Sequence, residues 1–144
     1  MPSFNEKKVL HYSREQIFEL VADVESYPYF LPWCIDCKKI SHSHDGFQAR
    51  MYIGFNLFRE SFISDVKLSE PDSIIVSYKD GPFKYLNNFW KFNSLNNTNE
   101  TEVDFHIDFE FRSIFFEALM GIWFEEAVRK MIRAFEERAD DLYS

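Results

Sequence analysis

Two cysteines are the residues of this chain that most readily suggest chemistry. The segment PWCIDC separates Cys34 from Cys37 by two residues, and this W-C-x-x-C pattern is typical of thioredoxin-like redox sites. Such a site needs a helix that begins at the first cysteine, because the helix N-terminus stabilises the thiolate. Here Pro28 and Pro32 precede the pair, and the strand-like KKISHSH follows it. We therefore favour a structural turn over redox chemistry.

Histidines and carboxylates offer two further candidates. A metal site would have to add His42 and His44 to the cysteines, but this spacing matches no zinc pattern. His106 lies between Asp104 and Asp108, yet all three share the polar face of one predicted strand, which a solvated surface explains. We predict no catalytic residue and no metal, and expect a protein that is not an enzyme and carries no covalent cofactor.

Two polar residues on predicted inner faces are candidates for holding the polar end of a ligand. Strand parity places Glu60 on the same face as Phe62, and Asn88 between Leu86 and Trp90. Carboxylates are rarely buried without a partner, so Glu60 fits a rim position or an ion pair better than an interior site. An amide costs less to bury, and Asn88 is therefore the better candidate.

The composition predicts one globular domain over residues 1–144. Apolar residues make up 46% of the chain and charged residues 28%, which is typical of a folded protein. The net charge of −8 argues against nucleic acid as a partner, because phosphate binding needs a basic surface. With 17 Phe, 7 Tyr and 3 Trp, the chain holds more large rings than a core of this size needs. Some of them should line a cavity or face a partner.

The order of the predicted elements indicates an α+β fold. Ser13 and Gln16 have the spacing of a capping box, which predicts a helix over residues 14–24. Residues 34–111 read as a meander of antiparallel strands, of which EVDFHIDFEF alternates most regularly between apolar and polar residues. The turns between these strands are indicated by Asp45-Gly46, Glu70-Pro71-Asp72, Asp80-Gly81-Pro82 and NNTNE at 96–100.

A long helix is predicted over residues 113–142, with Ser113 as its N-cap. Its second half is amphipathic, and its first half is apolar on nearly every side, which indicates contacts on more than one face. The expected inward residues of the second half are Val128, Met131, Ile132, Phe135 and Leu142. A strongly curved sheet can wrap around this helix, but it should leave space between them, so we expect an internal hydrophobic cavity.

Three segments carry a resemblance to a known family: YPYFLPWC, DGPFKYLNNFWKF and FRSIFFEALMGIWFEEAVRKMIRAFEERA. They resemble the coenzyme-Q-binding protein family of the START-like, polyketide cyclase-related superfamily, over essentially the whole chain. The resemblance implies a helix-grip fold whose hydrophobic tunnel holds ubiquinone or another lipid. It also implies support of respiratory electron transport without redox catalysis. A bacterial branch of the family is a ribosome-association toxin that blocks subunit joining.

We therefore predict non-catalytic binding of ubiquinone or a similar isoprenoid lipid, as a carrier or chaperone. A ribosome-associating toxin is the alternative, and a polyketide cyclase-like enzyme is a second one that would need polar groups inside the pocket. The predicted ligand-binding residues are Phe30, Leu31, Trp33, Phe55, Phe62, Tyr78, Asn88, Trp90, Phe105, Phe109, Phe111, Phe116, Leu119, Met120 and Trp123.

The polar N-terminal segment lacks the apolar core of a signal peptide, and no apolar stretch is long enough to span a bilayer. We expect a cytoplasmic protein that is peripheral to the inner membrane in a bacterium, or on the mitochondrial matrix side in a eukaryote. Two apolar segments, 27–33 and 115–124, are predicted to meet at one end of the sheet and to contact the membrane surface through Phe30 and Trp123. Gly121 is expected to allow a bend or a close approach of another backbone.

Overall fold

The computed structural model describes residues 3–55, 58–96 and 99–144, with the exception of the side chains of Phe55 and Phe58. These residues form one antiparallel sheet, two α-helices and one 3-10 helix. In chain order the elements are β1 (Ser3–Leu10), α1 (Arg14–Ala22), η1 (Val24–Tyr29), β2 (Cys34–Ser43), β3 (Gly46–Phe55), β4 (Phe58–Ser69), β5 (Ser73–Asp80), β6 (Phe83–Ser94), β7 (Thr101–Phe111) and α2 (Ile114–Tyr143).

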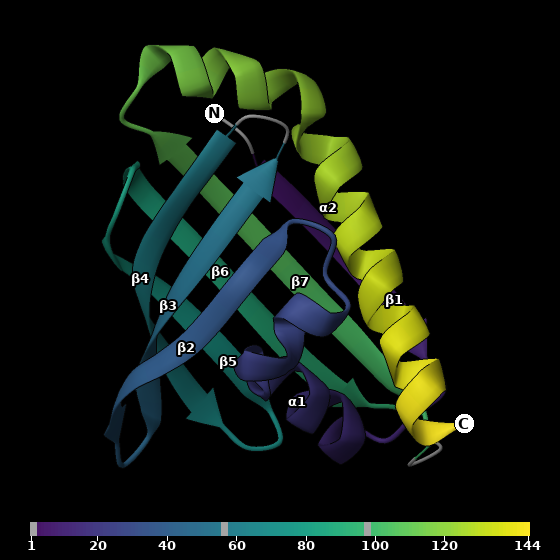
Figure 1. The fold of residues 1–144 in the computed structure, drawn as a ribbon. Coiled ribbons are helices and arrows are strands. Elements are labelled where there is room, and N and C mark those ends of the chain that lie inside the picture. The colour runs from purple at the N-terminus through teal and green to yellow at the C-terminus, as the bar shows by residue number, and fades with distance from the viewer. Residues whose placement is uncertain (1–2, 56–57, 97–98) are drawn as a thin grey trace.

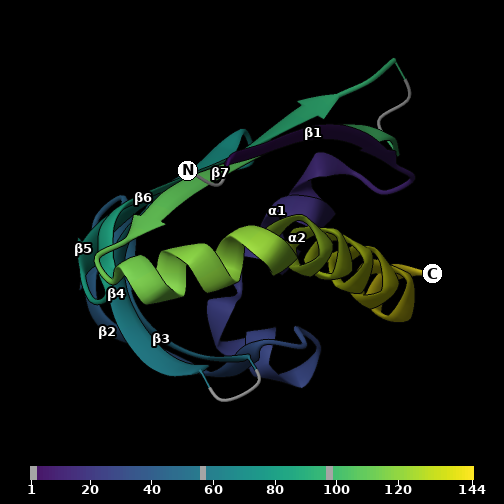
Figure 2. The ribbon, with the colours of Figure 1, turned by 90° about the horizontal axis from the view of Figure 1, so that it is seen from above.

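The sheet is an open meander, and its first strand is added at the edge next to β7. Its strand order is β1-β7-β6-β5-β4-β3-β2, so consecutive strands from β2 to β7 are neighbours and β1 pairs with β7. Figure 2 shows that the sheet curves strongly and that α2 lies on its concave side. Side chains that point to this side are enclosed between sheet and helix. The predicted α+β helix-grip architecture is confirmed.

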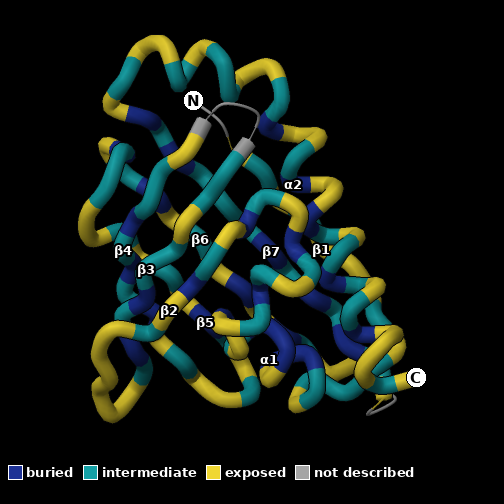
Figure 3. The backbone as a smooth tube through the Cα atoms, viewed as in Figure 1, coloured by how far each residue is buried: buried dark blue, intermediate teal, exposed yellow. Residues whose placement is uncertain are grey.

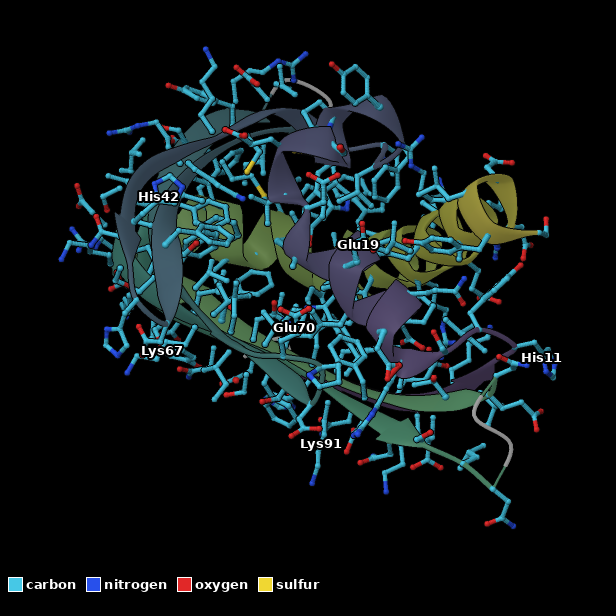
Figure 4. The ribbon with its side chains drawn as sticks, turned by 90° about the horizontal axis from the view of Figure 1, so that it is seen from below. His11, Glu19, His42, Lys67, Glu70 and Lys91 are labelled. Atoms are coloured by element: carbon cyan, nitrogen blue, oxygen red, sulfur yellow. The ribbon has the colours of Figure 1, made fainter. Side chains whose placement is uncertain are left out.

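Alternation along β7 separates the interior from the solvated face. Val103, Phe105 and Phe109 are buried against the core. His106 points the other way, where its ring stacks on Phe89 and its Nε2 lies 2.8 Å from a carboxylate oxygen of Asp108. Charged side chains lie on this face elsewhere too: in Figure 4 the exposed side chains of Lys67 and Lys91 are on this side of the sheet, where Ile75 is also exposed. The prediction that His106 belongs to the outer polar face is confirmed.

The predicted first helix forms, but it ends earlier and continues differently. The capping box is present, since the Ser13 hydroxyl accepts from the Gln16 backbone N–H and the Gln16 side chain accepts from the Ser13 backbone N–H. α1 ends at Ala22, two residues before the predicted end at residue 24, and η1 follows with Pro28 inside it, although prolines such as Pro28 are expected to end helical structure. Proline has no N–H to donate, and the backbone N–H groups of Ser26 and Phe30, on either side of it, donate to Asp23 and Tyr27.

The long helix α2 begins after Ser113, whose hydroxyl accepts from the backbone N–H of Phe116 at 3.3 Å. Figure 1 shows that α2 is bent: its first turns lie across one end of the sheet, and the rest runs along the sheet. Its buried residues are Phe124, Val128, Met131, Phe135 and Ala139.

The predicted inward position of Leu142 is wrong, because this side chain is 49% exposed. At this end of the helix the contact is made instead by Tyr143, whose hydroxyl donates to the carbonyl of Gln16 in α1 at 3.1 Å. The ring of Tyr143 also packs against Tyr12. The last turn of α2 is therefore rotated so that Tyr143, and not its neighbour, faces the body of the protein.

Part of the aromatic surplus is the core itself. The buried ring of Phe83, at the start of β6, contacts four others with centroid separations of 4.7 to 5.6 Å: those of Phe62, Tyr78, Phe109 and Phe111. The first three pairs meet edge to face and the pair with Phe111 is stacked, and aromatic pairs of these kinds each contribute about 0.5–1.5 kcal/mol beyond the burial of their area. This cluster joins β4, β5, β6 and β7 on the concave side of the sheet.

Candidate ligand-binding site

Two adjoining cavities lie between the sheet and α2. The outer cavity has a volume of about 130 Å³ and follows the first half of α2 from Met120 to Met131. The inner cavity has a volume of about 110 Å³ and is closed by α1, η1 and the later turns of α2 around Phe135. Ligand pockets typically measure about 300–1,000 Å³, so either cavity alone is too small for a whole lipid.

The two cavities are separated by side chains that line both of them. These shared residues are Trp33, Phe62, Leu86, Ile107 and Met131. Methionine side chains are unbranched and flexible, and three of them line the cavities: Met51, Met120 and Met131. Met131 is therefore the member of this partition that can move most easily, and a ligand that displaced it would widen the passage between the two cavities.

Polar groups gather at the inner cavity only. The Nδ2 of Asn88 donates to the carbonyl of His106 at 2.8 Å, and since an amide nitrogen carries two hydrogens, one more can be donated. Ser64 adds a hydroxyl with 6% exposure to the same cavity. The hydroxyl of Tyr27 donates to the carbonyl of Val21, and burial raises its pKa, so that it stays protonated. The outer cavity is lined by apolar residues and Gly54. The site thus has a polar inner end and an apolar outer end.

The two cysteines are buried at the beginning of β2, and both are free thiols. Desolvation by burial raises the pKa of Cys34 and of Cys37 from an ordinary 9.0 to about 12. Nucleophilic or redox chemistry needs the thiolate, which this environment disfavours. The segment is a strand and not the predicted turn, but it is equally unlike the helix N-terminus of a redox motif. Cys37 contributes instead to the wall of the inner cavity.

The predicted site residues divide according to where the structure places them. Nine of them line one or both cavities: Leu31, Trp33, Phe62, Asn88, Trp90, Phe105, Phe109, Phe111 and Met120. Five lie outside both cavities: Phe30, Tyr78, Phe116, Leu119 and Trp123. The side chain of Phe55 falls outside the described part of the structure. Ligand contact by any of these residues stays a prediction.

Phe30 and Tyr78 have structural partners. The ring of Phe30 packs edge-on against Phe135 at 5.2 Å, and the guanidinium of Arg138 lies over it at 5.3 Å. The hydroxyl of Tyr78 accepts from the backbone N–H of Phe83 at 3.1 Å. Through Phe30, the residue that follows η1, this segment is attached to the later turns of α2.

These contacts correct the prediction that segments 27–33 and 115–124 meet at one end of the sheet. Phe135 follows Phe115 by 20 residues, or roughly 30 Å along a helix, so Phe30 lies far from the first turns of α2. Only part of the prediction holds, because Trp33 does line the outer cavity together with Met120 and Phe124. Gly121 has no close neighbour either, since a side chain added there would meet no atom within 4 Å.

Glu60 lines neither of the two cavities. It belongs to a shallow groove between the ends of β2, β3 and β4, together with Asp36, Arg59 and Tyr52.

The structure also adds cavity-lining residues that are not among the predicted ligand-binding residues. Several of them have a signal in the sequence, namely the inner parity of β7 for Ile107 and the helical spacing of Phe124, Val128, Met131 and Phe135. Leu86 has such a signal too, because it shares the inner parity of Asn88 in β6.

The described residues hold neither a cluster that could bind a metal ion nor a helix that could cross a bilayer. Among residues 3–55, 58–96 and 99–144, no group of three His, Cys, Asp or Glu side chains comes together in a way that could hold a metal ion. In the same part of the chain, no helix is both long enough and apolar enough to cross a bilayer.

Comparison with known proteins identifies the family. Residues 10–136 match the family described as polyketide cyclase / dehydrase and lipid transport, and the chain belongs to this family. It is 35% identical over its full length to the persistence and stress-resistance toxin PasT of Escherichia coli, and 34% identical to the ribosome association toxin RatA of E. coli K12, covering 90% of each. It is also 33% identical over 97% of its length to the coenzyme Q-binding protein COQ10 homolog B of Xenopus laevis, 59% of which it covers.

Solved structures agree with this placement. The solution structure of the 18 kDa protein CC1736 from Caulobacter crescentus is 37% identical, with a TM-score of 0.79 over 99% of both chains. A START superfamily protein from Mycobacterium smegmatis has a TM-score of 0.81 over 97% of this chain at 20% identity. The ZhuI aromatase/cyclase from Streptomyces has a TM-score of 0.83 over 96% of this chain at 12% identity. At these identities the last two show a shared fold and nothing more.

Proposed function

We propose that this protein binds ubiquinone, or a related isoprenoid lipid, in the interior between sheet and helix, and that it acts as a carrier without catalysing a reaction. The observation that carries the proposal is the pair of adjoining cavities with hydrogen-bond donors at the inner end only. Membership in a family described by lipid transport, and the similarity to a coenzyme Q-binding protein, support the same ligand class.

The orientation of the ligand follows from this polarity. The quinone head group takes the inner cavity, where its carbonyl oxygens accept from the Asn88 amide and the Ser64 hydroxyl. The isoprenoid tail passes Met131 into the outer cavity and continues toward the first turns of α2. An apolar ligand of this length has little solubility in water, so we place the protein at the cytoplasmic face of a respiratory membrane.

The side chains that line the two cavities are poorly suited to catalysis. None of the described residues that line the two cavities carries a charge or an imidazole ring. A cyclase would need a general acid or base, and the protonated Tyr27 and Cys37 cannot act as bases near neutral pH. The shared fold with an aromatase/cyclase therefore does not extend the proposal to enzymatic activity.

The test is the binding of a short-tail ubiquinone to the purified protein, with two variants of α2 as a matched pair. Ala127 lines the outer cavity and Ala134 lines neither cavity, and both are half-buried on the same helix. Ala127→Phe should fill the tail path and weaken binding at least tenfold, whereas Ala134→Phe should leave it unchanged. Equal binding by both variants, with both folded by circular dichroism, would place the ligand elsewhere.

A second candidate function is association with the ribosome. It is favoured by one observation, the 34% identity to a ribosome association toxin over the whole of this chain. Sucrose-gradient sedimentation of a lysate that contains the wild-type protein separates the two functions. A carrier stays at the top of the gradient, and a ribosome-binding protein travels with a subunit.

A further inference from the structure

The first turns of α2 carry large apolar side chains on their outer surface. Ile114 is 88% exposed, Phe115 68% and Ile122 73%. At 100° per residue these three lie within an arc of about 120°, together with Ala118 and Gly121. We call these five residues the exposed apolar face. Figure 3 shows this end of α2 in teal and yellow only, with buried positions beginning further along the helix.

The opposite side of the same turns forms part of the ligand site. Met120 and Phe124 line the outer cavity, and both lie on the side of the helix that is turned away from the exposed apolar face. Figure 1 shows these turns lying across the end of the sheet. A single helical segment therefore stands between the interior of the protein and its surroundings, and it is apolar on both sides.

The chemistry of the exposed apolar face fits hydrocarbon better than a charged partner. None of its five residues bears a charge. The one acidic residue of this segment, Glu117, points elsewhere, and its carboxylate accepts from the backbone N–H of Phe111 at 2.8 Å. Attraction to anionic headgroups requires lysine or arginine, whereas the next turn of this side of the helix offers Glu125 and Glu126. The acidic turn would limit insertion to the first two turns.

We propose that residues 114–122 insert into the surface of a bilayer, and that the ligand passes beside Met120 directly between the membrane and the outer cavity. The inference rests on the proposed function for the direction of ligand transfer, while the docking itself rests on exposure and charge. Binding through apolar side chains alone should not depend on anionic lipid and should resist salt.

The experiment is flotation with vesicles of phosphatidylcholine, with and without phosphatidylglycerol. The variant Phe115→Gln/Ile122→Gln keeps helix propensity, and Leu142→Gln is the control, because Leu142 is exposed on the same helix but outside this face. Each substitution in the face should weaken partitioning roughly tenfold, since burying such a side chain contributes about 1.5 kcal/mol or more. The control should float like the wild type, and anionic lipid should not strengthen binding.

Delivery of a short-tail ubiquinone in detergent separates this inference from the proposed function. The Phe115→Gln/Ile122→Gln variant should bind quinone from detergent as the wild type does, yet take up little from vesicles. If the wild type binds quinone from detergent but does not float, the docking inference is wrong and the function stands. If it floats but binds no quinone by either route, the proposed function fails and the docking surface stands. A wild-type dimer that becomes monomeric in the variant, without flotation, would assign the face to a second copy of the chain.

Discussion

Met131 is the residue whose removal tests the tunnel most sharply. It is 7% exposed, it lies on α2, and its side chain lines both cavities. Substitution by alanine would remove one of the five side chains that separate the cavities, and the most flexible of them, without adding a polar group or breaking a hydrogen bond of the side chain. The variant Met131→Ala should therefore widen the passage between the two cavities.

The expected cost in the absence of ligand follows from core substitutions of this kind. Truncating a buried Met to Ala destabilises a protein by 2–5 kcal/mol, roughly in proportion to the cavity that remains. Met131 already borders empty space on two sides, so it makes fewer contacts than a fully packed residue and its loss should cost about 2–3 kcal/mol. Bound ligand should restore part of the lost free energy of unfolding, because a quinone that no longer has to displace the Met131 side chain binds more tightly. A tenfold gain in affinity adds about 1.4 kcal/mol of ligand-induced stabilisation.

Urea unfolding with and without a short-tail ubiquinone measures both quantities. The control is Ile17→Ala on α1, because Ile17 is 2% exposed but lines neither cavity. Both variants should lose stability without ligand, but only Met131→Ala should gain more from the ligand than the wild type does. A ligand-induced gain that is smaller in Met131→Ala than in Ile17→Ala would refute the idea that the ligand crosses this partition.

Three further predictions concern the frame around the site. Ser13→Ala removes the cap of α1 and should lower the free energy of unfolding in urea by about 1 kcal/mol. A loss below about 0.3 kcal/mol would mean that the cap does not stabilise the protein. Phe83→Ala removes the ring at the centre of the aromatic cluster and should cost about 3–5 kcal/mol by the same measurement, unless the neighbouring rings collapse inward. Burial raises the pKa of Cys34 and Cys37 from 9.0 to about 12, so their contribution to the free energy of unfolding is complete below pH 9 and falls as the pH rises toward 12. A Cys34→Ala/Cys37→Ala variant should therefore lose less stability than the wild type over this range. Parallel curves of unfolding free energy against pH for the two proteins would contradict the burial of the thiols.

The sequence predicts well those features that depend on local patterns. The capping box at Ser13, the alternation of β7 around His106 and the extent of α2 all follow from spacing within a few residues, and all are present. Asn88 was placed on an inner face by parity alone, and it does line the inner cavity. These positions are fixed by backbone geometry, which a single strand or helix determines by itself.

Features that depend on how elements pack on each other cannot be predicted from local sequence patterns in this way. Phe30 reads as an exposed ring in a turn, but η1 attaches to the later turns of α2 and brings this ring against Phe135. The prediction that Leu142 faces inward extrapolates one helical stripe, whereas the last turn contacts α1 through Tyr143. The apolar first half of α2 predicts contacts on more than one face, but its outer side is exposed. In each case the outcome depends on a neighbouring element.

The most direct test of the central claim is mass spectrometry of lipid extracted from the wild-type protein, purified without detergent from cells that make quinone. Binding in the tunnel predicts that ubiquinone, or another isoprenoid lipid, is recovered with the wild type and with Ala134→Phe, and is strongly depleted with Ala127→Phe, whose new ring fills the outer cavity. Recovery of the same lipid in equal amounts from all three proteins, or of none from any of them, would contradict an interior lipid-binding site.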